Sequence, residues 1–472
     1  MVLYIEIISL SLYYASNMGA LFYVGPAYET AMSDIRRLYP NLNVSHNLIT
    51  DTRFVQCTDW MDTSDDFIAQ YYYRNEDRWQ RANLTLFLNT VADCDGHGSA
   101  TLATNLRKFV ISSSPAGDIE NKVKWPTRIE TGSAGKAALV SATKLFAALL
   151  LHFNWTTVSI VCDAYRNPLY DTVAQIMQAT LSRLLRSNVS LTRVDGFSPQ
   201  TDYNFILNEV NKQTRVVLYI VFGSTLRKFL IAARSLNMTQ GEHQVHLCFR
   251  VTRNPLLGNF HWRYGDKYDE VAKEAYRTVL IAESDPDLDV PPAGSEARRL
   301  REQWRQASLE RYNFSYAASE PNTNLFPAYT MPLMVAQVVA EMVGANLTEL
   351  LQDGRHIARR FYNRTFRLRT GNVSFDQYGS SAGVDGIVEQ YDEAGNLTKV
   401  VHCAVGTVVP LAPVRIIEIK AVTWVGGVWP PPNRPPCGFD GMDPDCQPKR
   451  TLAVETLHPP ALPTALRFLL IR

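Results

Sequence analysis

The sequence lacks the charge imbalance that general nucleic-acid binding requires. Its 472 residues include 47 Lys and Arg against 46 Asp and Glu, a formal net charge of +1 at pH 7. No basic run interleaved with aromatic residues occurs along the chain. Proteins that bind nucleic acids broadly carry a clustered excess of positive charge. The composition therefore argues against nucleic acid as a partner.

Long apolar runs are also missing. No segment approaches the ~20 apolar residues of a membrane helix, because the last apolar piece, 465–471, is short and contains Arg467. Residues 2–14 are apolar enough for a signal peptide, but they lack a basic start and contain Glu6, so a first strand is an equal alternative. As written, the chain is expected not to span a membrane.

No catalytic motif is complete. Residues 132–136, Gly-Ser-Ala-Gly-Lys, resemble a phosphate loop, but Glu130 stands where its first Gly is needed and Ala137 where Ser or Thr should follow. His97 and Ser99 share one turn, where neighbours rarely form a nucleophile–base pair, and no Gly-x-Ser-x-Gly elbow occurs. An enzyme is therefore the least favoured class.

Metal ligands are equally sparse. His243, His246 and Cys248 are close in sequence, but residues three apart on a strand face opposite sides and no fourth ligand is in view. The acidic stretch 285–294 contains prolines and lacks the loop glycine of an EF-hand, which favours a solvated loop. We predict no metal site and no cofactor.

Asn-x-Ser/Thr sequons are in excess. Ser and Thr make up about one residue in eight, so the 26 Asn predict about three sequons by chance, against ten observed. The excess predicts N-glycosylation, with coincidence in a polar protein as the alternative. Asn154 is set apart because its expected helix-to-strand turn must leave room for a glycan. The nine predicted sites are Asn43, Asn83, Asn188, Asn237, Asn313, Asn346, Asn363, Asn372 and Asn396.

Seven cysteines form an odd set. Cys437 and Cys446 follow a strut with five prolines among residues 430–436 and flank a loop rich in Gly, Asp and Pro, so we expect a disulfide between them rather than free thiols or a metal site. A disulfide indicates an oxidising compartment. Cys57 and Cys94 lie in polar loops and are free to pair, whereas three cysteines in apolar strand-like runs are predicted to be core residues: Cys162, Cys248 and Cys403.

The chain alternates between predicted helices and strands. An amphipathic helix follows Gly25–Pro26, a strand covers 84–91 and an extended stretch covers 122–131. Next come helix 134–153, strand 157–162, helix 168–186, strand 189–194, helix 202–212, strand 215–222, helix 224–236 and strand 244–249. Repeated β-α-β units with apolar strands predict a parallel sheet covered on both faces.

A second array precedes this one, and α/β character resumes after a loop rich in Gly and aromatic residues at 254–267. A β meander at 371–419 is expected to return to one of the two sheets. The predicted fold class is a bilobal α/β protein of two doubly wound parallel sheets with multiple crossovers.

Ligands of open α/β sheets bind beyond the carboxyl ends of the strands. After three strands of the second array, this rule nominates Asp163, Ala164, Tyr165 and Arg166, then Asp195 to Phe197, then Gly223 and Ser224. For any single residue, an ordinary surface turn is an equal alternative. The ligand-binding candidates are therefore Asp163, Tyr165, Arg166, Asp195, Phe197 and Ser224.

The tail resembles that of natriuretic peptide receptors and the wider receptor-type guanylyl cyclases. Their ectodomains end in a Pro-rich run, Cys-Gly-Phe-Asp, a short acidic loop and Cys, as residues 430–446 do here. Residues 24–27 and 362–366, followed by Gly371 and Asp376, are similar to the same family. The resemblance covers most of 21–448 in outline.

This resemblance implies a type I periplasmic-binding-protein-like ectodomain that binds a peptide or other extracellular ligand, usually as a homodimer, and signals through a membrane helix to a cytoplasmic cyclase. It implies a membrane-distal lobe of 1–128 plus 258–368, a membrane-proximal lobe of 129–257 plus 369–420, and a juxtamembrane segment and divergent tail at 421–472. A small-solute or amino-acid binding domain of the same fold is the alternative.

The resemblance also bears on three details. Cys57 and Cys94 resemble the family's N-terminal bridge. Asp93 stands where the family's glycine-rich turn supports a bound chloride, so no chloride site is expected. Cys162 and Cys248 should lie on the first and fourth strands of a sheet of order 2-1-3-4, too far apart to pair, and we predict that both stay reduced.

The implied membrane helix and cyclase are absent from the chain as written, and residues 457–463 do not resemble the family. No enzymatic activity is therefore expected in this chain. A truncated gene model, a splice form and a decoy-like ectodomain all stay open. The expected location is the extracellular face of the plasma membrane in a parent receptor, or secretion.

Overall fold

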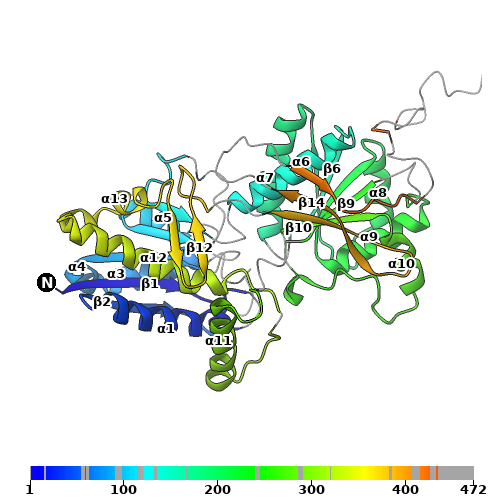
Figure 1. Cartoon of the computed structure of the whole chain (residues 1–472). Helices are drawn as coiled ribbons and strands as arrows, with labels where there is room; N and C mark the ends of the chain where they lie inside the picture. Colours follow the sequence, from blue (N-terminus) through cyan, green and yellow to red (C-terminus); the bar gives the residue numbers. More distant parts are fainter. Residues whose placement is uncertain are drawn as a thin grey trace, which may run out of the picture.

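A computed structural model describes residues 2–14, 18–54, 59, 63–90, 98–113, 119, 121–131, 136–165, 168–239, 245–251, 253–284, 291–318, 320–381, 385–404, 415–425, 432–433 and 439. The chain folds into two α/β lobes that lie side by side, each built around its own sheet (Figure 1). Arg166, Cys57, Cys94, Cys437 and Cys446 lie outside the described residues, so the two predicted bridges stay predictions.

The first lobe is built on a sheet of parallel strands. Its order is β2-β1-β3-β4-β5, and β1 is paired on both sides. Residues 3–10 therefore form the first strand, which was one of the two alternatives for this segment. The strands are β1 (Leu3–Leu10), β2 (Leu42–Ile49), β3 (Leu84–Asn89), β4 (Phe109–Ser112) and β5 (Arg128–Glu130).

Helices cover this sheet, and the hairpin β11–β12 packs beside them (Figure 1). These elements are α1 (Leu21–Leu38), α3 (Ser64–Arg74), α4 (Glu76–Arg81), α5 (Gly98–Asn105), α11 (Glu296–Tyr312), α12 (Leu325–Gly344), η3 (Thr348–Gln352), α13 (Gly354–Arg359), β11 (Thr365–Leu368) and β12 (Gly371–Ser374). The sequence was expected to contain no segment long and apolar enough to cross a membrane, but among the described residues α12 is one such helix. Because 72% of its apolar window is buried, the helix packs inside the lobe. It serves here as the central core helix of the lobe.

Helix α1 begins five residues before Pro26 rather than at it. A proline inside a helix lacks the N–H that would bond the carbonyl four residues earlier, here that of Phe22. The hydroxyl of Ser308, on α11, donates to the Phe22 carbonyl at 2.6 Å. A side chain from a helix almost 300 positions away thus satisfies the acceptor that Pro26 leaves open.

The second lobe is built on an eight-stranded mixed sheet of order β15-β14-β13-β10-β9-β8-β6-β7. Strands β6 to β10 are parallel, and β13 to β15 extend them antiparallel, as the predicted meander requires. The strands are β6 (Val158–Asp163), β7 (Ser190–Val194), β8 (Val216–Ile220), β9 (Val245–Phe249), β10 (Val279–Ser284), β13 (Gly386–Tyr391), β14 (Leu397–Ala404) and β15 (Arg415–Glu418).

The first four parallel strands have the spatial order 2-1-3-4 that was predicted. Strand β8 separates Cys162 on β6 from Cys248 on β9, and both thiols, like that of Cys403, are buried and free. Their prediction as reduced core residues is confirmed.

Both faces of the parallel part of this sheet are covered. Alternate strand residues face two separate cores: Ile160 and Leu218 lie in the core under α6 and α7, whereas Val161 and Val217 lie in the core under α8, α9 and α10. These helices are α6 (Lys136–His152), α7 (Pro168–Leu185), α8 (Tyr203–Asn211), α9 (Gly223–Ser235) and α10 (Asp269–Tyr276). Burial on both faces explains why the strands are almost continuously apolar.

The lobe boundaries expected from the sequence need two corrections. Strand β10 pairs with β9, so residues 269–284 belong to the second lobe and not to the first, as a boundary at 258 implied. Phe366, on β11, and Phe375, which directly follows β12, lie in the first core, so the return to the second lobe follows residue 375 rather than 368. The aromatic loop that suggested a crossing at 258 is instead held on α9 by Arg227, which pairs with Asp266 at 2.7 Å.

The connections between the lobes are linked to one another. The Glu130 amide donates to the Gly379 carbonyl at 2.9 Å, and the Ser381 amide donates to the Glu130 carbonyl at 2.9 Å. A third segment, η1 (Pro255–Leu257), packs Leu257 into the core of the second lobe and Leu256 against that of the first. These three segments connect the two lobes.

A C-terminal strap, residues 419–425 and 432–433, lies along the amino-terminal edge of the second sheet. The Asn433 amide group accepts from the Thr156 and Thr157 backbone N–H groups at 2.8 and 3.1 Å, just before β6. Trp424 packs edge-on against Trp155, with ring centroids 5.8 Å apart. Asn433 and Trp424 therefore fix the described part of the strap to this edge.

The side chain of Gln390 holds the middle of the strap. It donates to the Thr423 carbonyl at 2.6 Å and accepts from the Thr423 amide at 2.9 Å. We expect Gln390→Ala to lower the free energy of unfolding by about 1–3 kcal/mol, because the buried Gln390 side chain and its three hydrogen bonds to backbone groups of Arg277 and Thr423 are lost. Chemical denaturation of the purified chain measures this loss.

Gln175→Ala is the matched control, because Gln175 is exposed on α7 and bonds only Asp171 among the contacts described. Surface changes of this kind usually alter stability by less than about 0.5 kcal/mol. Equal effects of the two substitutions would contradict the role assigned to Gln390.

Candidate functional site

The predicted ligand-binding residues gather at the carboxyl edge of the second sheet, the edge formed by the carboxyl ends of β6 to β10. The loop after β6 joins the loop after β7 through a bond from the Ala164 amide to the Val194 carbonyl at 3.2 Å. The described candidates on this edge are Asp163, Tyr165, Asp195, Phe197 and Ser224. Since Arg166 lies outside the described residues, it stays a prediction.

Asp163 holds the loops of this edge together. Its side chain is fully buried and accepts from the Gly196 amide at 3.3 Å and from the Thr225 hydroxyl at 2.9 Å. One carboxylate at the end of β6 therefore bonds the loop after β7 and the first turn of α9. Its geometry suits a positioning role rather than direct contact with a ligand.

Gly196 is required by this close approach. A Cβ atom at this position would lie 2.1 Å from the Thr225 hydroxyl oxygen and 2.6 Å from an Asp163 carboxylate oxygen. Such distances are far inside van der Waals contact. No larger residue fits without moving one of the three segments.

The loop after β7 has its own internal order. The Asp195 carboxylate accepts from the amides of Phe197 and Ser198 at 3.1 and 3.2 Å, which is the geometry of an Asx turn. The Gly196 carbonyl accepts from the Tyr203 hydroxyl and from the Lys228 ammonium, both at 2.9 Å. The loop is therefore preorganised without a ligand.

Aromatic side chains pack together at this edge, with Tyr165 the most exposed of them and Tyr170 fully buried. Phe222 packs edge-on between Tyr170 and Phe197, with ring centroids 4.8 and 5.1 Å away. Tyr165 is 63% exposed, and Phe197 is half-buried. The edge offers aromatic rings above a fixed polar frame, which suits apolar side chains of a ligand flanked by hydrogen-bonding groups.

Two titratable groups at this edge, Tyr203 and Cys162, have pKa values far above neutral pH. Burial, assisted by the charges of Asp163 and Asp195, raises the pKa of Tyr203 to about 12. Burial likewise raises the pKa of the Cys162 thiol to about 12. Both groups therefore stay protonated at physiological pH and have no tendency to act as a base or nucleophile.

One cluster at the same edge was missed in the sequence. Arg250 and Glu283, at the ends of β9 and β10, are almost fully buried and bond each other at 2.6 Å, and Glu389 joins them 2.5 Å from Arg250. Arg253 bonds both carboxylates from a half-exposed position. Burial opposes ionisation of Glu283, but the two guanidinium groups outweigh it and hold its pKa below the ordinary value.

The rule that nominated Asp163 would have found this cluster if it had been applied to β9 and β10. Arg250 directly follows β9, and Glu283 is the penultimate residue of β10. The antiparallel partner strand β13 carries Glu389, and no sequence rule places that strand beside β10.

The other sequence candidates are not assembled into sites within the part of the chain that is described. His246 is buried between the Tyr219 hydroxyl at 3.1 Å and the Met238 carbonyl at 3.3 Å, and burial lowers its pKa to about 4. The described residues contain no group of three or more His, Cys, Asp or Glu that could hold a metal ion. His97, His243 and 132–135 lie outside the described residues.

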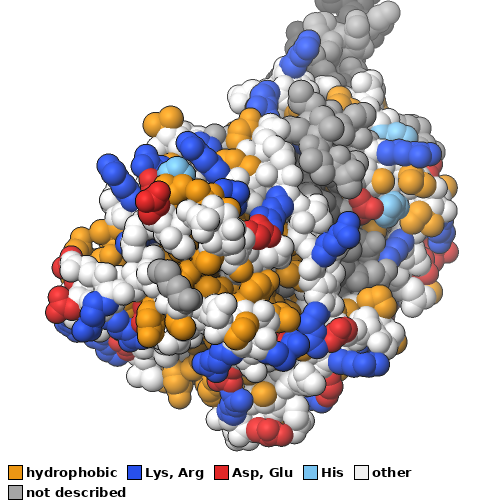
Figure 2. All heavy atoms as spheres, turned by 60° about the vertical axis from the view of Figure 1, so that its left-hand side comes forward, with side chains coloured by type: hydrophobic (Ala, Val, Ile, Leu, Met, Phe, Trp, Pro, Cys, Tyr) orange, Lys and Arg blue, Asp and Glu red, His pale blue; other side chains and the backbone are white. Residues whose placement is uncertain are grey.

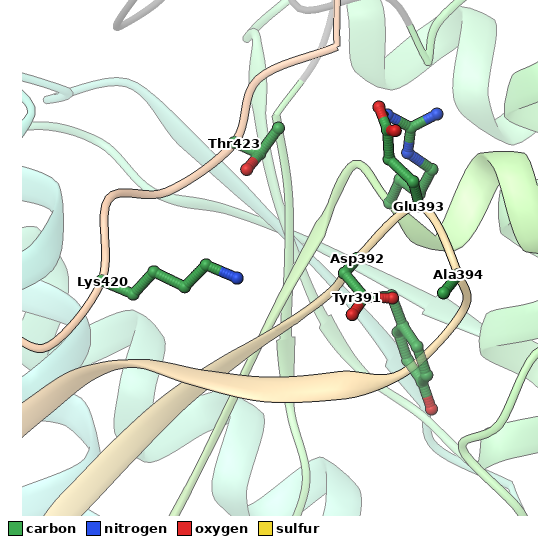
Figure 3. A pocket seen from close by; sticks show the side chains of 7 residues that line it. Tyr391, Asp392, Glu393, Ala394, Lys420 and Thr423 are labelled. Carbon is green, nitrogen blue, oxygen red and sulfur yellow. The ribbon is translucent and has the colours of Figure 1, made fainter.

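A cavity of about 350 Å³ lies at the opposite, amino-terminal edge (Figure 3). The β13–β14 turn forms one wall and the strap the other, and Lys420 extends toward Asp392 across it. Arg277 pairs with Glu393 at 2.8 Å. Charges of both signs line the cavity, and it is separate from the predicted ligand edge.

The surface of the first lobe has a mixed character. On the face turned forward in Figure 2, basic and acidic side chains are interspersed, with apolar side chains between them. No field of a single sign covers that face.

The chain consists of two α/β lobes whose connections lie next to each other, and the second lobe has a preorganised carboxyl edge. Together these features define a ligand-binding domain with a periplasmic-binding-protein-like fold. Residues 97–392 match the family described as "Receptor family ligand binding region". This match covers more than half of the chain and extends over both lobes, so the chain belongs to that family.

Curated proteins similar to this chain are receptors. The chain is 25% identical over 243 residues to "Receptor-type guanylate cyclase gcy-28" of Caenorhabditis elegans, covering 50% of this chain and 18% of that protein. It is 24% identical over 261 residues to "Atrial natriuretic peptide receptor 3" of Mus musculus, covering 53% and 45%. It is 25% identical over 330 residues to "Atrial natriuretic peptide receptor 2" of Rattus norvegicus, covering 65% and 29%.

The expected resemblance to natriuretic peptide receptors and receptor guanylyl cyclases is thus confirmed, and the main interpretation fits these relatives better than the small-solute alternative. The chain spans less than half the length of the curated relatives it matches.

Substitution of Gly196 tests the packing of this edge. We expect Gly196→Ala to destabilise the chain by about 1–3 kcal/mol, as overpacking of a filled site does. Gly344→Ala is the control, since a Cβ there would meet nothing within 4 Å and the residue ends α12. Denaturant unfolding that gave both variants the wild-type stability would refute the close approach.

Proposed function

We propose that this chain is the extracellular ligand-binding region of a receptor guanylyl cyclase and that its ligand is a peptide of the hormone type. The observation that carries the proposal is the match of residues 97–392 to the receptor ligand-binding family. The names of the similar proteins, atrial natriuretic peptide receptors and a receptor-type guanylate cyclase, support the class of ligand and the kind of parent.

The carboxyl edge of the second sheet is the proposed contact surface. Tyr165 and Phe197 would contact apolar side chains of the ligand, while Asp195 and Ser224 would offer hydrogen bonds. Asp163 would act by positioning, because its carboxylate is engaged by Gly196 and Thr225. In this arrangement, aromatic anchors do the binding and a buried carboxylate keeps them in place.

The charge distribution favours a peptide over a free amino acid. A site for a zwitterionic solute needs buried charges turned toward the cleft. Here Arg250 is paired with Glu283 and Glu389, and Asp163 is satisfied by its own loops. Aromatic contact with a larger ligand remains as the main source of affinity.

The remaining features of the proposal follow the family resemblance. We expect an extracellular location, a homodimer, disulfides Cys57–Cys94 and Cys437–Cys446, and no cofactor or chloride. The cyclase reaction would belong to a part of the parent protein outside this chain. The strap, which leads from the second lobe into the Pro-rich segment, supports that lobe as the one nearer the membrane.

Peptide binding can be tested with labelled atrial natriuretic peptide and the chain secreted from animal cells. Fluorescence anisotropy should show saturable binding that Tyr165→Ala and Phe197→Ala each weaken at least tenfold, about 1.4 kcal/mol, as loss of an aromatic anchor does. Tyr73→Ala is the control, because Tyr73 is 57% exposed but lies on α3 of the first lobe.

Binding of free amino acids to the same chain is measured in parallel by calorimetry. Binding of an amino acid by a chain that ignores the peptide would overturn the proposal in favour of the small-solute alternative. Equal affinities in all three aromatic variants would reject the carboxyl edge as the contact surface.

The parent can be tested by sequencing transcripts past codon 448. We expect an in-frame apolar stretch of ~20 residues followed by a cyclase domain, because a receptor of this class needs a membrane helix. A stop codon in every transcript would contradict a receptor parent and favour a secreted binding protein.

A further inference from the structure

Most sequon asparagines lie on the surface of the folded chain. Nine of the ten are exposed, including Asn154, whose turn was expected to be crowded. The exception is Asn83, which is half-buried and accepts from the Tyr4 amide at 2.8 Å. The fold therefore leaves room for a glycan at nearly every sequon.

Five of these asparagines share one backbone conformation. Their φ angles lie between 51° and 58°, the left-handed region, and each follows a helix or helical turn: Asn154, Asn237, Asn313, Asn346 and Asn363. At Asn154 and Asn237 the next residue completes a Schellman motif: the Trp155 amide donates to the Leu150 carbonyl at 2.7 Å, and the Met238 amide to the Ala233 carbonyl at 2.8 Å. Asn is the residue used most after Gly at such ends, and an apolar residue follows it.

Helix termination explains the Asn and its apolar neighbour, but not the Ser or Thr that comes next. Among the described residues, the other non-glycine residues in this conformation are Arg107 and Arg186, and neither is followed two positions later by Ser or Thr. All five left-handed asparagines do, although Ser and Thr make up only about one residue in eight. A second requirement, independent of capping, accounts for the hydroxyl residue.

The sequons of the second lobe share one edge. Asn154 lies between α6 and β6, Asn188 between α7 and β7, Asn237 after α9, and Asn396 in the turn between β13 and β14. Helices that cover a parallel sheet run back against the strands, so their carboxyl ends meet the amino-terminal edge. All four asparagines thus lie at the edge that the strap also occupies.

We infer that Asn154, Asn188, Asn237 and Asn396 carry N-linked oligosaccharides, which surround the strap at the amino-terminal edge of the second lobe. The donor is an oligosaccharide on a lipid pyrophosphate. The amide Nδ2 bonds the reducing-end C1 and loses one proton, while the C1–oxygen bond to the lipid pyrophosphate breaks and the lipid pyrophosphate leaves with that electron pair.

This arrangement divides the second lobe into a covered and a bare edge. The strap and four bulky, solvated glycans cover the amino-terminal edge against any macromolecule. The carboxyl edge carries none of the four sequons. A protein or peptide partner of this lobe is therefore directed to the carboxyl edge, a conclusion that depends on the proposed function only for the identity of that partner.

Site mapping tests the modification without any ligand. The chain secreted from animal cells is released from its glycans by an amidase in ¹⁸O water, and its peptides are analysed by mass spectrometry. Each of the four asparagines should appear as ¹⁸O-labelled Asp. Absence of the label at two or more of them would overturn the inference.

A second experiment separates capping from modification. Asn154→Gly and Asn237→Gly keep a residue suited to positive φ, so the deglycosylated variants should unfold at or above the wild-type temperature, while each secreted variant should lose the mass of one glycan. Arg186→Gly, directly after α7, is the matched control and should lose no glycan. Unchanged mass in both Asn variants would refute the modification.

The bare edge can be blocked by design. Pro199→Asn creates a sequon with Thr201 in the exposed loop after β7, and Pro199→Gln does not. With labelled atrial natriuretic peptide as the probe, the new glycan should reduce affinity at least tenfold, whereas Asn154→Gly should leave it unchanged. The reverse result would overturn the division of edges even where mapping confirms all four glycans.

Discussion

Burial of a parallel sheet on both faces is the constraint on which this structure depends. Parallel neighbours need a crossover for every strand, and each crossover helix returns the chain to the amino-terminal edge. The second lobe therefore has two chemically distinct edges. Strand-to-helix loops collect at the carboxyl edge, and helix-to-strand turns collect at the other. The ligand contacts and the glycans that we propose would therefore lie at opposite ends of the lobe.

Buried charges maintain the carboxyl edge but do not face outward. Asp163 holds two loops through Gly196 and Thr225, and Arg250 is enclosed by Glu283 and Glu389. A buried ion pair adds little net stability compared with apolar packing, but removing only one of its two partners destabilises the fold strongly. Such groups fix one loop geometry in preference to others. This leaves the exposed aromatic rings as the groups with freedom to contact a partner.

The sequence predicted most of the regular structure, because period and turn signals are local. The alternation from helix 134–153 to strand 244–249 matches α6 to β9 within a few residues, and the strand order 2-1-3-4 placed Cys162 and Cys248 apart correctly. The lobe boundary at 258 was wrong because it depended on a long-range contact. The aromatic loop stays on the second lobe because Arg227 pairs with Asp266 and Phe260 lies in the core under α8, α9 and α10.

The site was predictable in outline for a related reason. A rule about strand ends locates three candidates: Asp163 is the last residue of β6, Asp195 directly follows β7, and Ser224 is the second residue of α9. It cannot separate a ligand contact from an internal tie, because that difference lies in the Gly196 amide and the Thr225 hydroxyl that reach Asp163 from other segments. Because the rule does not include contacts from other segments, it also did not identify Glu389, which bonds Arg250 from an antiparallel strand about 140 residues later.

The sequons show how one residue type meets two constraints at once. A helix end needs a residue that tolerates positive φ, and Gly is the usual solution. At Asn154 and Asn237 this chain uses Asn instead, which strains the left-handed region more than Gly but offers an amide nitrogen. Capping alone would favour Gly, and modification alone would not require a helix end. We propose that Asn154 and Asn237 serve both purposes, and both residues lie at the amino-terminal edge of the second lobe. This combination is expected if glycans keep that edge free of protein partners.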